Sequence, residues 1–202
     1  FDTPVAFEEV RHEGIEQVTS DDLAYAASLG LSLKLIGTAE RVPDGDGGEG
    51  ISVRVHPAFL YEGHPLASVN GSFNAVTIES PAITEITISG PGAGGTQTAS
   101  AVLGDVVTAM QPRPAGGASG PSQRLAVVTD VPGAYYLHVE VDDRPGVLAE
   151  LAQVLGLQGI SVKSFVQEGQ GSQAQLSMVL HPVLESRLTA AIELIDGLET
   201  VR

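Results

Sequence analysis

The 202-residue chain contains no cysteine and is poor in positive charge. Without cysteine, disulfides, thiolate metal ligands and cysteine nucleophiles are all excluded. Lysine and arginine together number 10 against 25 aspartates and glutamates, which gives a formal net charge of −15. Such a surface repels phosphates, so we expect neither nucleic acid nor an anionic membrane surface as a partner.

Long apolar runs are also absent from the sequence. No stretch approaches the ~18–20 apolar residues that a membrane-spanning helix needs, and no basic segment followed by an apolar one marks a secretory signal. We therefore expect a cytoplasmic protein. Hydrophobic residues nonetheless make up 43% of the chain, which is enough for a packed core and argues against wholesale disorder.

Both ends of the chain resemble cut points. The chain opens with Phe1-Asp2-Thr3-Pro4 without an initiator methionine, and it stops at Val201-Arg202 in a short β-like run. We expect a piece of a longer protein, and a processed mature protein is the alternative.

One break in composition divides the chain. Residues 112–123 hold three prolines and three glycines and no large apolar side chain. Such a segment cannot bury surface and is typical of a linker. The predicted organisation is therefore a domain at 1–111, a linker at 112–123 and a domain at 124–202.

Hydrophobic periodicity predicts both helices and strands in the first part. Thr19-Ser20-Asp21-Asp22 and Gly30 frame an apolar run, which predicts a capped helix of about ten residues. Alternation with a period of two predicts strands, and apolar spacing of three and four predicts a second helix. In chain order these further elements are an extended segment at 31–41, strands at 51–56, 75–79 and 85–89, and a helix at 96–110. We expect one sheet of three or four strands with helices at its ends.

The second part shows a β-α-β-β-α-β order. Its predicted elements are a strand at 136–142, a helix at 147–159, an extended segment at 160–166, a strand at 176–180, a helix at 184–198 and the start of a last strand at Val201. This is the order of the ferredoxin-like unit, a four-stranded antiparallel sheet with two helices on one face. The fold class is therefore α+β, a mixed sheet domain followed by a ferredoxin-like domain.

The sharpest local motif is Gly90-Pro91-Gly92-Ala93-Gly94-Gly95, which joins a predicted strand to a predicted helix. Glycines let the backbone approach a phosphate, and free amides at a helix start face an anion. The full dinucleotide fingerprint is missing, because no further strand and no acidic residue about 20 positions on follows the helix. Contact with a cofactor phosphate and a tight structural turn are both open interpretations.

A second turn, from Asp142 to Leu148, joins the first strand of the second part to its helix. Gly146 allows the backbone to come close to a ligand, and the amides that start at Val147 could hold a carboxylate. Asp142 or Asp143 could accept a hydrogen bond from an ammonium group. An ordinary strand-to-helix turn is the alternative.

Two histidines raise the question of a metal. His56 and His64 each precede a proline and lie eight residues apart. No third ligand stands at a recognisable spacing, so we expect turn and capping roles and no metal site.

Several segments together carry a resemblance to a known family. They are Val53-Arg-Val-His-Pro57 with His64-Pro-Leu-Ala-Ser-Val-Asn-Gly-Ser-Phe-Asn-Ala-Val76, Gly90-Pro-Gly-Ala-Gly-Gly95 with Thr98-Ala-Ser-Ala-Val102 and Gly104-Asp105, and Glu9-Val-Arg-His-Glu-Gly-Ile15 with Val18-Thr19, Asp22-Leu23 and Tyr25-Ala26. In this order they resemble homoserine dehydrogenase. Residues 135–202 resemble the ACT domain, an amino-acid-sensing module that follows the catalytic region in long homoserine dehydrogenases.

The resemblance implies reversible hydride transfer between NAD(P)(H), with NADP expected, and the pair L-homoserine and L-aspartate 4-semialdehyde. The family's dinucleotide domain and catalytic lysine belong upstream, and neither Lys34 nor Lys163 matches that lysine. We therefore expect no catalytic residue and no activity in this chain alone. The glycine-rich turn carries over, with Gly94 expected at the cofactor and Gly92 and Gly95 as its neighbours.

The resemblance also implies regulation and assembly. Residues 1–111 would be the end of the substrate and dimerisation domain, with the helix that returns to the cofactor domain. The ACT domain is expected to bind an amino acid, L-threonine, at Asp142, Asp143, Gly146 and Val147. The family's substrate region dimerises through its sheet, so a homodimer or tetramer is expected, and its monovalent cation uses ligands upstream. A free-standing amino-acid-binding module is the alternative, against which the motifs of the first part argue.

Overall fold

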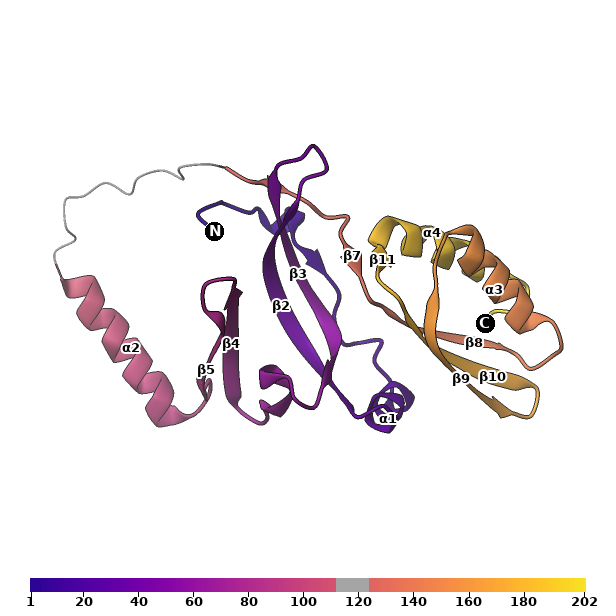
Figure 1. Ribbon diagram of the computed structural model, residues 1–202. Helices are drawn as coiled ribbons and strands as arrows, with labels where there is room; N and C mark the ends of the chain where they lie inside the picture. The colour runs from indigo at the N-terminus through magenta and orange to yellow at the C-terminus, as the bar shows by residue number, and fades with distance from the viewer. Residues whose placement is uncertain (112–123) are drawn as a thin grey trace. The chain divides into compact units, whose positions relative to one another are not determined.

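The computed structural model describes residues 1–111 and 124–202, so the predicted linker at 112–123 lies outside the described residues (Figure 1). The chain forms two compact units that are built from interleaved segments. One unit contains Phe1–Pro4, His12–Gly37 and Val55–Arg124, and the other contains Val5–Arg11, Thr38–Arg54 and Leu125–Arg202. The division of the chain at 112–123 stays a prediction, since segments from the first part group with the second.

Helix α1 (Ser20–Ser28) begins at the predicted cap. The Thr19 side chain accepts a hydrogen bond from the Asp22 backbone N–H, and the Asp22 carboxylate accepts one from the Thr19 N–H at 2.8 Å. This reciprocal pair satisfies two of the amides that a helix start leaves without intrahelical partners. The prediction of a capped helix is confirmed. The short elements η1 (Phe7–Glu9) and β1 (Arg11–His12) precede it.

The long strands of the first part lie in one sheet. β2 (Leu31–Pro43) and β3 (Glu49–Tyr61) belong to a four-stranded sheet with the order β1-β3-β2. The fourth strand, β6 (Ala126–Val127), pairs in parallel with the start of β3. Both long strands extend beyond the segments predicted from alternation.

The other two predicted strands form a separate hairpin. After the short helix η2 (Pro65–Ser68), β4 (Phe73–Ser80) and β5 (Thr84–Pro91) pair only with each other among the described residues. The expectation of a single sheet was therefore wrong, because alternation identifies a strand but not its neighbour. One face of the hairpin carries four apolar side chains that are 47–64% exposed, Val76, Ile78, Ile86 and Ile88.

Helix α2 (Gly95–Met110) follows β5, as predicted. Its apolar residues recur at helical spacing, yet none of them is buried. These residues form an apolar stripe along the helix. Its large side chains are all at least half exposed: Val102, Leu103, Val106, Val107 and Met110. The helix thus presents an apolar surface within its own unit.

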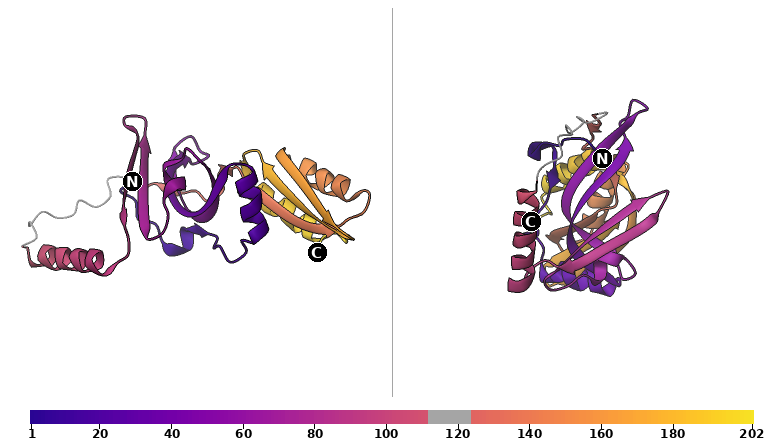
Figure 2. Two further views of the ribbon diagram at one scale, coloured as in Figure 1. Left: turned by 90° about the horizontal axis from the view of Figure 1, so that it is seen from below. Right: turned by 90° about the vertical axis from the view of Figure 1, so that its left-hand side faces the viewer.

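The second part of the chain folds in the predicted β-α-β-β-α-β order. Its elements are β8 (Tyr136–Asp142), α3 (Val147–Leu157), β9 (Val162–Gln170), β10 (Gln173–Leu180) and α4 (Glu185–Asp196). The strands form an antiparallel sheet of order β8-β10-β9, and both helices cover the same face of it (Figures 1 and 2). The α+β fold class is confirmed.

Two details of this part differ from the prediction. The expected last strand is a single antiparallel bridge between Val201 and Val141 of β8. An unpredicted pairing of two-residue strands joins β7 (Pro132–Gly133) to β11 (Val183–Leu184).

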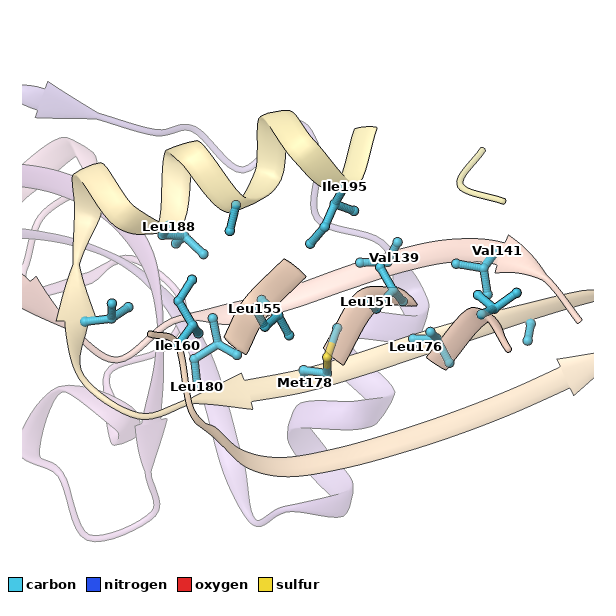
Figure 3. Close-up of a cluster of buried hydrophobic side chains, with 14 residues drawn as sticks. Val139, Val141, Leu151, Leu155, Ile160, Leu176, Met178, Leu180, Leu188 and Ile195 are labelled. Carbon is cyan, nitrogen blue, oxygen red and sulfur yellow. The ribbon is translucent and has the colours of Figure 1, made fainter. Parts of the chain in front are cut away.

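A core of 14 buried hydrophobic residues fills the space between this sheet and its two helices (Figure 3). Leu151 of α3 is 1% exposed, and Leu180 of β10 is fully buried. Truncation of such a side chain to alanine typically costs ~2–5 kcal/mol. The core therefore fixes the end of β8 and the start of α3, between which the turn at 142–146 lies.

Candidate functional site

The turn between β8 and α3 takes its shape from one glycine. Gly146 stands at the N-cap of α3 with φ 101° and ψ −22°, a conformation that residues with a side chain rarely adopt. No side chain caps the helix at this point. The first amides of α3 therefore lack a side-chain partner and point toward the turn, as the amides of any helix start do.

A hollow of about 380 Å³ opens at this turn. It brings together all four residues that the sequence predicts for an effector, Asp142, Asp143, Gly146 and Val147. Its other lining residues are Val141, Arg144, Pro145, Leu148, Gln167 and Leu176. The hollow thus combines helix-start amides, charged groups of both signs and an apolar floor.

The two aspartates of the hollow differ in their surroundings. Asp142 already accepts hydrogen bonds from the Arg202 guanidinium, whose Nε lies 2.7 Å from Oδ1. The Asp143 side chain is exposed and lies over Gly169 of β9, where an added Cβ would come within 2.9 Å of its Oδ2. Because the Asp142 carboxylate is neutralised by Arg202, Asp143 is the better placed acceptor for a ligand ammonium group.

Sequence reasoning missed Gln167 and Arg144 as lining residues. Gln167 stands opposite Leu176 in the β9–β10 register, which places both at the hollow. Alternation along β9 could have predicted on which face of the sheet Gln167 lies. It could not have predicted that β9 pairs with β10, which is what brings Gln167 to the turn. Arg144 lies inside the predicted turn. It would have been predicted as a lining residue if every residue of the turn had been included in the site.

The glycine-rich turn between β5 and α2 holds three predicted cofactor residues in different environments. A Cβ at Gly92 would lie 2.1 Å from the Asn74 side-chain amide, so a larger residue there would displace the exposed Asn74 side chain. Gly94, at φ 128°, is the N-cap of α2, and a Cβ there would lie 2.4 Å from Oε1 of Gln97. Gly95 has open space around its Cα.

Gly94 and Gly95 border a shallow apolar surface at the start of α2. The other residues that line it are Thr98, Ala99, Val102 and Leu103. Gly92 does not belong to this group. The structure therefore brings two of the three predicted cofactor residues to one surface, where the first amides of α2 carry no side-chain cap.

His64 has a capping role in the structure. Its Nδ1 accepts a hydrogen bond from the Leu66 backbone N–H at 3.1 Å, at the start of η2. For His64 this agrees with the expected turn role. The same expectation was wrong for His56 and Pro57, because both lie inside the strand β3. In the part of the chain that the structure describes, no group of three or more histidine, aspartate or glutamate side chains is arranged to hold a metal ion. Among the same residues, no helix is long and apolar enough to cross a membrane.

Comparison with known proteins places these features in a class. Residues 135–200 match the ACT domain family, and residues 1–107 match the family of homoserine dehydrogenase. Fold and sequence together therefore define a class of protein in which a mixed sheet region is followed by a C-terminal ACT domain. The chain belongs to the homoserine dehydrogenase family and represents its C-terminal region.

Individual relatives support this assignment over the whole chain. Homoserine dehydrogenase of Corynebacterium glutamicum is 41% identical over 100% of this chain and 46% of its own length, and that of Mycobacterium tuberculosis is 35% identical over 100% and 48%. The crystal structure of a homoserine dehydrogenase from Thiobacillus denitrificans superposes with a TM-score of 0.85 at 33% identity, covering 100% of this chain and 47% of that one. The chain therefore spans about half the length of the relatives it matches.

Proposed function

We propose that this chain is the C-terminal half of a homoserine dehydrogenase that interconverts L-homoserine and L-aspartate 4-semialdehyde. The observation that carries the proposal is the match of both parts of the chain, in the family's order, to enzymes of that name. The catalytic lysine and the dinucleotide domain belong, on this proposal, to the half of the relatives that the chain does not span. No residue of this chain is assigned a catalytic role.

The cofactor that the family implies is a nicotinamide dinucleotide, and we propose NADP(H). The start of α2 fits one edge of such a site, because Gly94 has a glycine-only backbone conformation and the first amides of the helix carry no side-chain cap. Gly94 and Gly95 would hold the cofactor at this edge, while Gly92 serves the turn itself. When bound, the nicotinamide supplies or accepts the hydride, and this chain contributes only positioning.

The hollow at the start of α3 is the proposed effector site. An α-amino acid would place its carboxylate at the amides of Val147 and Leu148 and its ammonium group at Asp143. Gln167 offers an amide to a polar side chain, as L-threonine would present. We propose feedback control by L-threonine on this basis.

Self-association is proposed from exposed apolar surface. The apolar face of the β4–β5 hairpin would be covered by a second copy, and the stripe of α2 by the half of the enzyme outside this chain. A homodimer or tetramer in the cytoplasm is the expected form.

The test compares the full-length enzyme with this chain. The full-length protein should oxidise L-homoserine with NADP⁺ and be inhibited by L-threonine, whereas the 202-residue chain alone should show no turnover, because hydride transfer needs a positioned cofactor and a proton-transfer group. Full-length protein without homoserine oxidation would contradict the assignment. Turnover that follows the isolated chain through purification would contradict the placement of the catalytic groups.

A further inference from the structure

An asparagine–glycine pair forms the turn between η2 and β4. Asn70 and Gly71 are both exposed, and Gly71 has φ 64°, a left-handed conformation that glycine adopts readily. The sequence holds only one other asparagine, Asn74. An asparagine followed by glycine is chemically labile, because glycine has no side chain to shield its backbone nitrogen from the preceding side-chain amide. The turn therefore presents a reactive pair to water.

Two hydrogen bonds hold the Asn70 side chain. Its Oδ1 accepts a hydrogen bond from Nζ of Lys34 at 2.9 Å, and its Nδ2 donates one to the Ser68 carbonyl at 3.1 Å. Lys34 lies in β2, and its Nζ also donates to the Val69 carbonyl at 2.7 Å. Hydrogen bonds from a charged donor are among the strong ones in proteins. The side-chain amide is therefore fixed at both of its polar atoms by residues that precede it in the chain.

Deamidation of Asn70 requires its side chain to turn toward the next residue. The Gly71 backbone nitrogen attacks Cγ of Asn70, the new C–N bond closes a succinimide ring, and the bond from Cγ to Nδ2 breaks. The Gly71 N–H proton leaves with that amino group as ammonia. Water then opens one of the two ring C–N bonds, which gives either aspartate or isoaspartate, whose main chain is longer by a methylene. An amide held at both Oδ1 and Nδ2 cannot rotate freely toward Gly71, so the two hydrogen bonds oppose the reaction.

The same turn is attached to the glycine-rich turn between β5 and α2. The Phe73 N–H donates to the Asn70 carbonyl at 3.3 Å, and Phe73 stands opposite Pro91 in the β4–β5 register. The Gly92 N–H donates to the Ser72 carbonyl at 2.7 Å. An isoaspartate at position 70 would lengthen the main chain just before Ser72. It would therefore displace the carbonyl that holds the Gly92 amide.

We propose that Asn70 is a deamidation site, that the hydrogen bond from Lys34 protects it, and that isoaspartate formed there loosens the glycine-rich turn at Gly92. All of these residues belong to one compact unit. The proposal gives a role to one of the only two lysines in the chain. It goes beyond the dehydrogenase function and does not depend on it, because the chemistry needs only this turn and water.

Mass spectrometry of the aged 202-residue chain tests the site. Cleavage after glutamate releases residues 63–79, which contain both asparagines, and fragment ions locate the mass gain that turns an amide into an acid. Folded wild type should deamidate at Asn70 more slowly than wild type in concentrated urea, and equal rates would overturn the proposal. Folded Lys34→Met should deamidate at least about threefold faster than folded wild type, because a hydrogen bond from a charged donor is lost. An equal or slower rate in folded Lys34→Met would overturn the role of Lys34.

A matched control and amide exchange separate protection from local unfolding. Lys163→Met removes the other lysine, which lies in β9 in the second unit, and should leave the rate at Asn70 unchanged. Equal acceleration in both lysine variants would overturn the role of Lys34. Amide exchange along β4 should be the same in Lys34→Met and wild type. Faster exchange along β4 would show that the segment unfolds, and would overturn protection by the side-chain hydrogen bond.

The effect on the glycine-rich turn has its own measurement. Asn70→Asp carries the charge of the product on a normal main chain, so it isolates the effect of the extra methylene. Amide exchange at Gly92 should be at least about threefold faster in wild type aged until Asn70 has reacted than in fresh Asn70→Asp, because the Ser72 carbonyl is displaced. Equal exchange at Gly92 in the two samples would overturn the link between Asn70 and the glycine-rich turn.

Discussion

Substitution of Gly146 separates a ligand-binding turn from an ordinary one. The glycine has φ 101°, and an added Cβ would meet no atom within 4 Å. Gly146→Ala therefore costs conformational strain alone, ~1–2 kcal/mol, which weakens the folding equilibrium about 5–30-fold. Gly30→Ala is the matched control, because Gly30 has φ 67°, equally open space and a place in the other unit.

Gly146→Asp adds charge to the same strain. A carboxylate about 4 Å from a bound carboxylate is repelled by ~1–4 kcal/mol, depending on how far water screens the pair. We expect calorimetric titration of the 202-residue chain to show L-threonine binding in wild type and in Gly30→Ala, and at least about tenfold weaker binding in Gly146→Asp. Isoleucine, methionine and lysine, titrated separately, establish selectivity.

The outcomes distinguish the site from the sensor. Equal threonine affinity in Gly146→Asp and wild type would refute the placement of the carboxylate at the start of α3. Heat from none of the four amino acids at millimolar concentration would leave the ACT domain as an association module only. If Gly30→Ala weakened threonine binding as much as Gly146→Asp does, the loss of binding would come from backbone strain and not from the position of the new side chain.

Three further predictions concern other parts of the chain. Gly94→Val in the full-length enzyme should raise the KM for NADP⁺ more than that for homoserine, and a loss of stability with unchanged cofactor affinity would favour a purely structural turn. Wild type should associate at tens of micromolar in sedimentation runs, and threonine in place of both Val76 and Ile88 should yield monomers; a monomeric wild type would contradict this. Hydrogen bonds from Ser186 lower the pKa of Asp130 below its usual 3.8, so the carboxylate stabilises the fold above that pH and loses its effect as the pH falls through the lowered value. Asp130→Ala should therefore lower the free energy of unfolding by about 0.5–1 kcal/mol at pH 7 and by progressively less as the pH falls below 3.8 in denaturant titrations. A loss that stays the same at every pH would refute the charge argument.

Features encoded within a few residues were predictable from the sequence. The cap of α1 follows from Thr19 and Asp22 three positions apart, and the structure pairs them reciprocally. Alternation along β10 gave the buried face that contains Leu176 and Leu180. The hollow also formed where a strand end and a helix start meet at Gly146, because all of its predicted residues are neighbours in sequence.

Features that depend on distant partners were not predictable. Arg202 neutralises Asp142 from 60 positions away, and Asp130 caps α4 from 56 positions away. The strand β6 has only two residues, too few for any period to appear. Local patterns report which face of an element is apolar, whereas the choice of partner is decided by tertiary packing.

The parallel pairing of β6 with β3 has a consequence for how the chain leaves the ribosome. Ala126 pairs with Gly50 but is synthesised 76 residues later, which at ordinary translation rates is a delay of roughly 4–15 s. During this interval the start of β3 has an unprotected edge, the kind of surface that nucleates intermolecular pairing. Messages that end before the codon for Ala126 would yield a nascent chain whose β3 edge is never covered, so chaperone dependence should rise sharply for such truncations.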